Sequence, residues 1–326
     1  MLTGKRSEPT AGRWEPYDGR LSRTVLREPG AVMSPATHLE ATLHSDPACP
    51  WAYSASPALR VIEWRYGDQL KWRLVLIGLT EDASQYEARG YTPQRAARGQ
   101  LRYRRYGMPL APNPKARISA TARACRAVVA ARLLDPGSEW RVFRALQLAN
   151  FTTGLLLDDD AQLADALSEV PGIPAAGEIV ASLDSDEVSE AYERDRAEAR
   201  TAAGSPTELQ GKTAASDGPV RYTAPSVVFE RDGRRLEAGG FQPVEAYDVL
   251  VANLDPTISR EPVPPSPAPL LQRFGDGLST QEVAALLAEG NDAVDRPAAE
   301  AALLELVASG DAVRRPLGDD ALWQAA

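Results

Sequence analysis

One cysteine of this chain stands where a thiol is expected to be reactive. Cys49 lies between residues 39–43, which predict a short strand, and residues 57–66, which predict a helix. At such a junction the unpaired backbone N–H groups and the helix dipole both favour a negative charge. Pro50 suits the first turn of a helix, because proline has no N–H to leave unsatisfied. We therefore predict that Cys49 is a nucleophilic thiolate at a helix N-terminus.

The residues around Cys49 resemble a known family. The stretch 46–53, Asp-Pro-Ala-Cys-Pro-Trp-Ala-Tyr, resembles the active-site turn of DsbA-type thioredoxin-fold oxidoreductases, most closely that of the FrnE-like branch. The resemblance implies that Cys49 is the catalytic nucleophile. The active-site turn would be formed by its neighbours Asp46, Pro47, Pro50, Trp51 and Ala52.

A second part of the resemblance lies 176 residues downstream of Cys49 (225 − 49), at Pro225. Ala224, Pro225 and Ser226 precede an apolar stretch and resemble the cis-proline loop of thioredoxin folds. Proline is the residue for which a cis peptide bond costs little. The resemblance implies that this loop faces Cys49 and positions the substrate. The long spacing fits the FrnE-like pattern, in which a helical subdomain is inserted into the thioredoxin fold.

The sequence departs from the family motif at one decisive position. The motif usually reads Cys-Pro-Trp-Cys-Tyr, but residue 52 is an alanine. In a two-cysteine motif, the second thiol resolves the mixed disulfide that the first one forms. With Ala52, the resemblance implies monothiol chemistry, in which a second thiol comes from solution. We expect no tightly bound cofactor, and a low-molecular-weight thiol, mycothiol or glutathione, as co-substrate.

Two further residues are candidates for a supporting role. His44 ends the predicted strand, and an imidazolium there would help to hold the thiolate, although a structural histidine is the commoner case. Cys125 lies in an Ala-rich segment, residues 118–134, that predicts a helix. A cysteine in such a helix is usually a small buried residue. The alternative is that Cys125 resolves the mixed disulfide at Cys49.

The predicted elements are those of an α/β protein with a thioredoxin fold. Residues 39–78 read as strand, helix and strand, a parallel unit with a crossover helix. Helical periodicity from about 84 to 203 predicts the inserted α-helical subdomain. A hairpin over 226–238 and a helix over 243–254 complete a domain that we place at 33–255. Residues 1–32 are expected to be a disordered or loosely attached extension.

The C-terminal part is predicted to be a separate module. Residues 256–269 are rich in proline and predict an extended linker. Residues 270–326 read as helix, helix and a two-stranded ribbon, an α+β order that resembles a winged helix. This segment holds four basic and ten acidic residues, so its net charge is 4 − 10 = −6. DNA binding requires the opposite sign, and we expect packing or protein contacts instead, including self-association into a homo-oligomer.

Composition excludes several classes of function. The net charge of −9 over 326 residues argues against a nucleic-acid partner. Two histidines and two cysteines without ligand spacing predict no metal site. The sequence has no apolar run long enough to span a membrane. Two cysteines in so long a chain favour a reducing compartment, so we expect a cytoplasmic protein that acts on thiol or disulfide substrates.

Two alternatives remain at this stage. Kappa-class glutathione transferases and hydroxychromene-carboxylate isomerases share the fold with its insert, and use a serine in the position of Cys49. The missing second cysteine favours that class, whereas Cys49 itself argues against it. The other alternative is a non-catalytic thioredoxin-like adaptor, in which the C-terminal module contacts partners. The reactivity of Cys49 distinguishes the adaptor from an enzyme.

Overall fold

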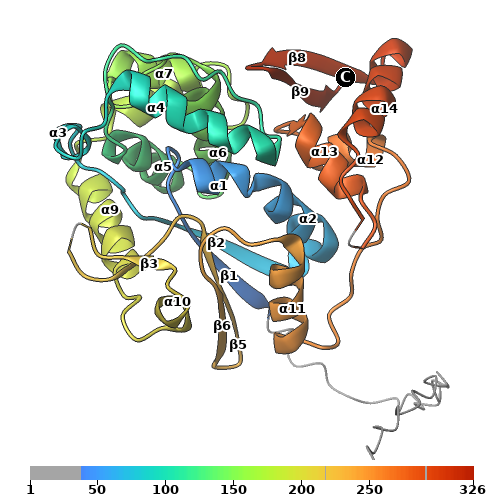
Figure 1. The fold of residues 1–326 in the computed structure, drawn as a ribbon, viewed down its shortest axis with the longest axis horizontal. Coiled ribbons are helices and arrows are strands. Elements are labelled where there is room, and N and C mark those ends of the chain that lie inside the picture. The colour runs from blue at the N-terminus through green and yellow to red at the C-terminus, as the bar shows by residue number, and fades with distance from the viewer. Residues whose placement is uncertain (1–37, 217, 291) are drawn as a thin grey trace, which may run out of the picture. The chain divides into compact units, whose positions relative to one another are not determined.

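The computed structural model describes residues 38–326 except 217 and 291, so the extension predicted over 1–32 lies outside the described residues. A four-stranded sheet with the order β2-β1-β5-β6 forms the centre of the fold (Figure 1). Strands β1 and β2 are parallel, whereas β5 is antiparallel to both β1 and β6. Their bounds are Leu39–Ser45 (β1), Leu70–Leu76 (β2), Ser226–Arg231 (β5) and Arg234–Ala238 (β6). Only one residue of β1 is exposed, as expected of a central strand.

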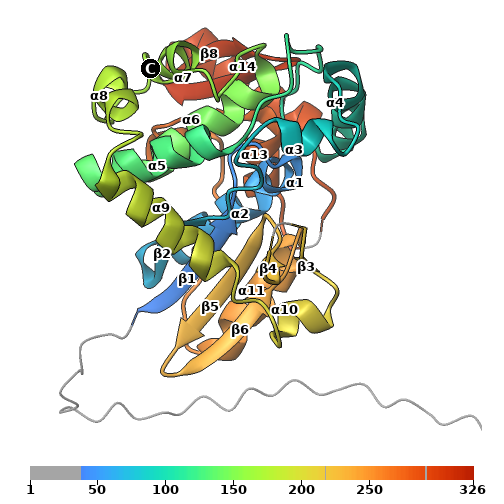
Figure 2. The same ribbon diagram turned by 90° about the vertical axis from the view of Figure 1, so that its left-hand side faces the viewer.

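Helices connect and cover this sheet in the predicted thioredoxin topology. The short helix α1 (Pro50–Ser54), α2 (Ser56–Tyr66) and the 3-10 turn η1 (Gly67–Gln69) form the crossover from β1 to β2. Helix α11 (Val244–Leu254) follows the hairpin β5–β6 and packs against both of its strands and α2. Figure 2 shows α11 and the insert helix α9 on opposite sides of the sheet. The predicted fold class is confirmed.

A helical insert separates β2 from β5. Its α9 packs along β2 and against α5, and α5 packs against α6. Two short strands after it, β3 (Thr213–Ala214) and β4 (Arg221–Tyr222), form a separate small sheet. The helices of the insert are α3 (Ser84–Glu87), α4 (Pro93–Gln100), the 3-10 helix η2 (Leu101–Tyr106), α5 (Ala122–Leu134), α6 (Glu139–Thr152), α7 (Asp160–Leu167), α8 (Ala176–Ala181), α9 (Asp186–Ala199) and α10 (Pro206–Leu209).

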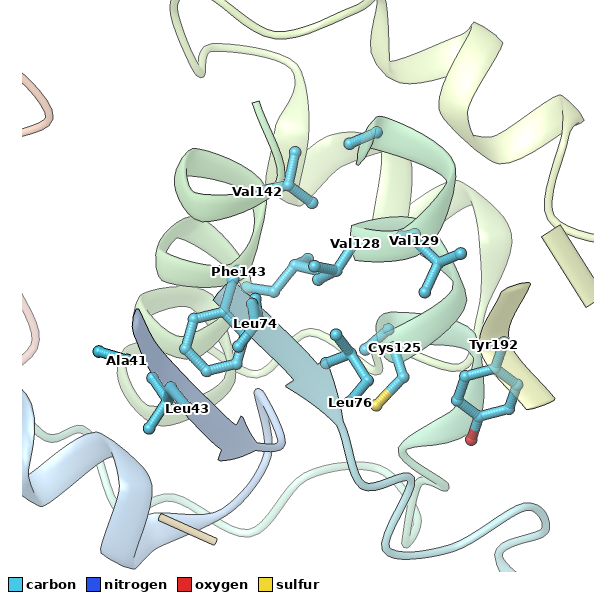
Figure 3. Packing of buried hydrophobic residues seen from close by; sticks show 14 of the residues in the cluster. Ala41, Leu43, Leu74, Leu76, Cys125, Val128, Val129, Val142, Phe143 and Tyr192 are labelled. Atoms are coloured by element: carbon cyan, nitrogen blue, oxygen red, sulfur yellow. The ribbon is translucent and has the colours of Figure 1, made fainter. Parts of the chain in front are cut away.

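The core lies between the sheet and the insert. Figure 3 shows Leu74 and Leu76 of β2 facing Val128 of α5 and Phe143 of α6. Helix α5 is buried over eight of its thirteen residues, most of them alanines. Small side chains let helices approach closely, and close packing is what a protein interior requires. The Ala-rich composition of this segment therefore reflects its central position.

The C-terminal module has an α+β arrangement that is compatible with the predicted winged-helix-like domain. Its three-stranded sheet has the order β7-β9-β8. The elements are α12 (Ala268–Arg273), β7 (Leu278–Ser279), α13 (Thr280–Leu287), α14 (Arg296–Ser309), β8 (Ala312–Leu317) and β9 (Asp320–Ala325). Helix α12 thus begins inside the segment expected to be a linker. The chain just before α12 lies against α2. There, Glu261 N donates to Arg65 O at 2.8 Å, and Trp64 Nε1 donates to Pro262 O at 2.8 Å.

The module packs on the thioredoxin domain through α13, which lies beside α2 (Figure 1). Val61 of α2 belongs to the same hydrophobic cluster as Val283 and Leu286 of α13. The proline-rich segment therefore does not hold two bodies apart. Among the described residues, no helix combines the length and the apolar composition needed to cross a membrane.

Candidate active site

Cys49 occupies the N-cap position of α1, and Pro50 is the first residue of that helix. The preceding turn is closed by two hydrogen bonds to Asp46, from Cys49 N to the backbone O at 3.1 Å and from Ala48 N to Oδ1 at 2.8 Å. Pro47 is buried inside this turn. The Cys49 side chain is only 6% exposed, and its Sγ donates to the backbone O of Ala224 at 3.2 Å.

The electrostatics of Cys49 differ from the sequence prediction. Burial raises the pKa of the Cys49 thiol to about 12, and the negative charge of Asp46 adds to this effect. The backbone N–H groups of Ala52 and Trp51 act in the opposite direction, but they do not compensate for the lost hydration. The prediction of a lowered thiol pKa is therefore wrong for this structure, because it counted the helix N-terminus and not the burial.

The loop around Pro225 lies at the end of β1 that leads to Cys49. Ser226 is paired with His44 in the sheet, and the peptide bond between Ala224 and Pro225 is cis. Ser226 Oγ donates to Thr223 O at 2.7 Å and accepts from Gly240 N at 3.1 Å. The structure thus brings Ala224 and Pro225 to the thiol. The hydroxyl of Ser226 is engaged in hydrogen bonds that shape the loop.

His44 does not support a thiolate in this structure. The side chain is 2% exposed, and its ring lies against Tyr222 with 4.4 Å between ring centroids. Its Nδ1 has no hydrogen-bond partner in the described part of the chain. Burial lowers the pKa of His44 to about 4, so the ring is neutral at physiological pH. A neutral imidazole carries no charge to offer Cys49, and the structural interpretation of His44 applies.

Asp46 is a fully buried carboxyl group next to the thiol. Its Oδ2 accepts hydrogen bonds from Leu79 N at 2.9 Å and from Thr121 Oγ1 at 2.8 Å. Burial raises the pKa of Asp46, while these hydrogen bonds favour the charged form. Asp46 therefore ties the active-site turn to the residues that follow β2 and to the start of α5.

Cys125 belongs to the core between α5 and the sheet. Figure 3 shows its sulfur between Leu76 of β2 and Tyr192 of α9. The Sγ atom lies 3.5 Å from Asp46 Oδ2, and burial raises the pKa of this thiol well above its ordinary value. Both cysteines are free, and each sulfur has a different acceptor. In this structure Cys125 is a buried core residue.

An aromatic cluster lies around Trp51 of the active-site turn. Trp51, 37% exposed, meets Tyr103 edge to face with 5.1 Å between ring centroids, and lies 5.7 Å from both Tyr106 and Phe241. Tyr106 and Phe241 also contact each other, at 4.7 Å. The sequence analysis missed this cluster. The arginines of residues 94–106 predict either a solvated face or a cationic rim beside the thiol, suited to the carboxylates of a small thiol or an acidic substrate, and neither interpretation includes the aromatic cluster.

Sequence comparison decides the family of this site. The profile of the DSBA-like thioredoxin domain matches residues 42–220, more than half of the chain. The chain belongs to the family of DSBA-like thioredoxin domains. This is a family of thiol-disulfide oxidoreductases, as the active-site resemblance implied. No curated protein sequence is significantly similar to this chain.

Solved structures share the DsbA-like fold. A candidate protein disulfide isomerase from Nitrosomonas europaea has a TM-score of 0.50 at 20% identity, over 66% of this chain and 97% of that protein. A candidate DsbA oxidoreductase from Streptomyces coelicolor has a TM-score of 0.50 at 18% identity, over 70% of this chain and 93% of that protein. Both alignments leave about a third of this DsbA-like chain unmatched.

The position of the second motif cysteine is filled by a buried alanine. Ala52 is 3% exposed and packs in a small cluster with Cys49, Val75 and Ala224. The DsbA-like site therefore has one thiol where the family motif has two. In the described ranges, 38–216, 218–290 and 292–326, no group of three or more His, Cys, Asp or Glu side chains is placed to hold a metal ion.

Proposed function

We propose that this protein is a monothiol thiol-disulfide oxidoreductase in which Cys49 alone forms mixed disulfides. The proposal rests on the placement of Cys49 at the start of α1, where its sulfur lies against the backbone carbonyl of Ala224, the residue before the cis-proline Pro225. Ala52 occupies the position of the second cysteine of the family motif. The substrates would be thiols or disulfides, with mycothiol or glutathione as co-substrate in the cytoplasm. Self-association through the C-terminal module would have to use faces other than the one that α13 presents to α2.

The reaction consists of three exchange steps. The Cys49 thiolate attacks one sulfur of a disulfide, so that a bond from Sγ to that sulfur forms and the other sulfur leaves as a thiolate. A low-molecular-weight thiolate then attacks the mixed disulfide at the substrate-derived sulfur, and the Cys49 thiolate departs. A second small thiolate then attacks the disulfide between the substrate and the first small thiol, so that the substrate thiolate leaves and the disulfide of the small thiol forms. Over the three exchanges the substrate disulfide gains two electrons, and the two molecules of the small thiol lose one electron each.

Deprotonation of Cys49 has to accompany substrate binding. With a pKa near 12, the buried thiol is almost entirely protonated at neutral pH. A substrate that binds to the loop of Ala224 competes for the carbonyl that now accepts from Sγ. Once the thiol proton is lost to solvent, the N–H groups of Trp51 and Ala52 stabilise the thiolate. Without substrate the thiol is therefore buried and hydrogen-bonded, and substrate binding has to expose it before it can react.

The test is the formation of a mixed disulfide at Cys49. The reduced protein is incubated with oxidised glutathione, and the products are identified by mass spectrometry. We expect one glutathione adduct on wild-type protein and on Cys125→Ser, and none on Cys49→Ser. A folded protein that forms no adduct with glutathione disulfide or with an uncharged small disulfide contradicts the proposal.

A non-catalytic adaptor is the second candidate, and the burial of Cys49 favours it. A thiol that is 6% exposed and protonated would remain silent if no substrate opened the site. The same experiment separates the two candidates, because an adaptor would remain without adducts on Cys49 under conditions in which the unfolded protein reacts. A transferase or isomerase of the kappa-class kind would instead turn over substrate in the Cys49→Ser variant.

A further inference from the structure

A cavity of about 240 Å³ lies beside the active-site turn. Ala48 and Pro50, the two neighbours of Cys49, form part of its wall, and Tyr103 of the aromatic cluster forms another part. Most of the remaining lining also comes from the insert, from α4, residues 113–121 and the end of α6. A molecule in this cavity would therefore contact both chain neighbours of Cys49.

The cavity is cationic in an otherwise acidic protein. Four basic residues and no aspartate or glutamate contribute to its lining: Arg95, Arg102, Lys115 and Arg117. Arg117 is paired with Asp158 at 2.7 Å. For the other three, the described part of the chain provides no carboxylate within salt-bridge distance. In a chain with a net charge of −9, a concentration of unpaired positive charge points to an anionic ligand.

Two arginines at the mouth are held in place by tyrosines. The Arg95 guanidinium lies over the ring of Tyr91, 5.3 Å from its centroid, and that of Arg102 lies over the ring of Tyr103 at 5.0 Å. Arg95 Nη1 also donates to Gly90 O at 2.9 Å. Guanidinium groups that are stacked in this way keep N–H groups at their edges, and these N–H groups suit the two oxygens of a carboxylate.

Deeper in the cavity, Lys115 is a largely buried cation. Its Nζ donates to Asn150 Oδ1 at 2.9 Å and to Leu155 O at 2.7 Å. An ammonium group has three N–H donors, and the described residues supply no acceptor for the third. Both hydrogen-bond partners are neutral, and Asp158 acts on the charge of Lys115 only from beyond salt-bridge distance, so no bound carboxylate neutralises it. Burial lowers the pKa of Lys115 to about 8, which still leaves it mostly charged at neutral pH.

We infer that this cavity binds the carboxylates of the small thiol that resolves the mixed disulfide at Cys49. The inference rests on the proposed function and makes it more specific, because it favours a thiol with free carboxylates over an uncharged one. Of the two co-substrates expected from the sequence, glutathione carries two carboxylates, whereas mycothiol is a sugar conjugate without a net charge. The cavity selects the charged thiol.

The test measures binding without redox chemistry. S-methylglutathione keeps both carboxylates but cannot exchange its sulfur, and its affinity for the full-length Cys49→Ser protein is measured by calorimetry. We expect binding that weakens about tenfold in Arg95→Gln and in Arg102→Gln, the scale of one charge-assisted hydrogen bond. Arg98→Gln is the matched control, because Arg98 is exposed on the same helix, α4, and does not line the cavity. It should bind as the parent does.

The dimethyl ester of S-methylglutathione provides the second comparison, because it lacks both negative charges. We expect it to bind at least about tenfold more weakly than the acid. No binding of the acid, equal affinity of the ester, or affinity that is unaffected by both cavity variants would overturn the inference. If binding follows Arg95 and Arg102 while Cys49 forms no mixed disulfide, the anionic cavity stands and the oxidoreductase proposal fails. If Cys49 forms the mixed disulfide but the affinity for S-methylglutathione does not depend on Arg95 and Arg102, the oxidoreductase proposal stands and the cavity inference fails.

Discussion

Arg144 and Glu282 form a buried ion pair that joins the helical insert to the C-terminal module. Arg144 Nη1 donates to Glu282 Oε1 at 2.8 Å, and the exposed fractions of the two side chains are 8% and 0%. Glu282 also closes the capping box of α13 on Ser279, and accepts from Ser56 Oγ of α2. One carboxylate thus connects the module, the insert and the crossover helix α2. The module is therefore a fixed part of the described fold.

Neutralising Glu282 is expected to destabilise the whole protein. Glu282→Gln leaves Arg144 buried with Asp276 as its remaining ionic partner, at 3.1 Å from Nε. Removing one member of a buried ion pair typically costs about 3–5 kcal/mol. We expect a loss toward the lower end of that range in the free energy of unfolding, measured in urea. Glu305→Gln is the control, since Glu305 is exposed on α14 and its loss should have little effect. Equal stability of both variants would contradict this prediction.

The same carboxylate predicts how stability depends on acid. Burial opposes ionisation of Glu282, but the positive charges of Arg144 and Arg60 outweigh it and hold the pKa at about 2, below the ordinary 4.5. A lowered carboxyl pKa contributes stability that is fully present above pH 4.5 and is lost as the pH falls toward 2. The contribution is on the order of 3 kcal/mol. Wild-type protein should therefore lose more unfolding free energy than Glu282→Gln between pH 5 and pH 2.5. If the unfolding free energies of wild-type protein and Glu282→Gln fell in parallel with pH, Glu282 would not be the source of this acid sensitivity.

Local patterns in the sequence were sufficient to predict the features that depend only on residues nearby in the chain. The cap position of Cys49, the first-turn Pro50 and the capping box of Ser279 and Glu282 are all decided within a few residues. The order of strands and helices followed from hydrophobic periodicity. These features could be predicted because hydrogen bonds and side-chain direction over short distances follow from residue type.

The features that decide reactivity depend on contacts that no local pattern encodes. The carbonyl that accepts from Cys49 Sγ is 175 residues away in the chain, and the partner of Arg144 is 138 residues away. Burial of Cys49 requires both the Ala224 loop and the insert to be in place, so a helix N-terminus alone gave the wrong direction for its pKa. Glu282 could be predicted as a capping residue but not as the partner of a buried arginine.

Alkylation of Cys49 should reveal a protected, protonated thiol. Because burial raises the pKa of Cys49 to about 12, native Cys125→Ser protein should react slowly with iodoacetamide at pH 7. Its pH midpoint should lie above the ordinary thiol value of about 8.5, and unfolding in urea should return it to that value. Rates are measured between pH 6 and pH 10, with the double variant Cys49→Ser/Cys125→Ser as the blank. A native midpoint below that of the urea-unfolded protein would show that the helix N-terminus outweighs burial.

Asp46 should influence the same titration through its charge. The carboxylate of Asp46 raises the pKa of Cys49, so Asp46→Asn is expected to move the alkylation midpoint to lower pH. The variant should also lose about 1–3 kcal/mol of unfolding free energy, because an amide N–H in place of Oδ2 would meet the N–H of Leu79. Asp165→Asn is the matched control: it removes one exposed charge on α7 and should change neither quantity. A midpoint that stays in place in a folded Asp46→Asn protein would mean that burial by the Ala224 loop, and not the neighbouring carboxylate, keeps the thiol protonated.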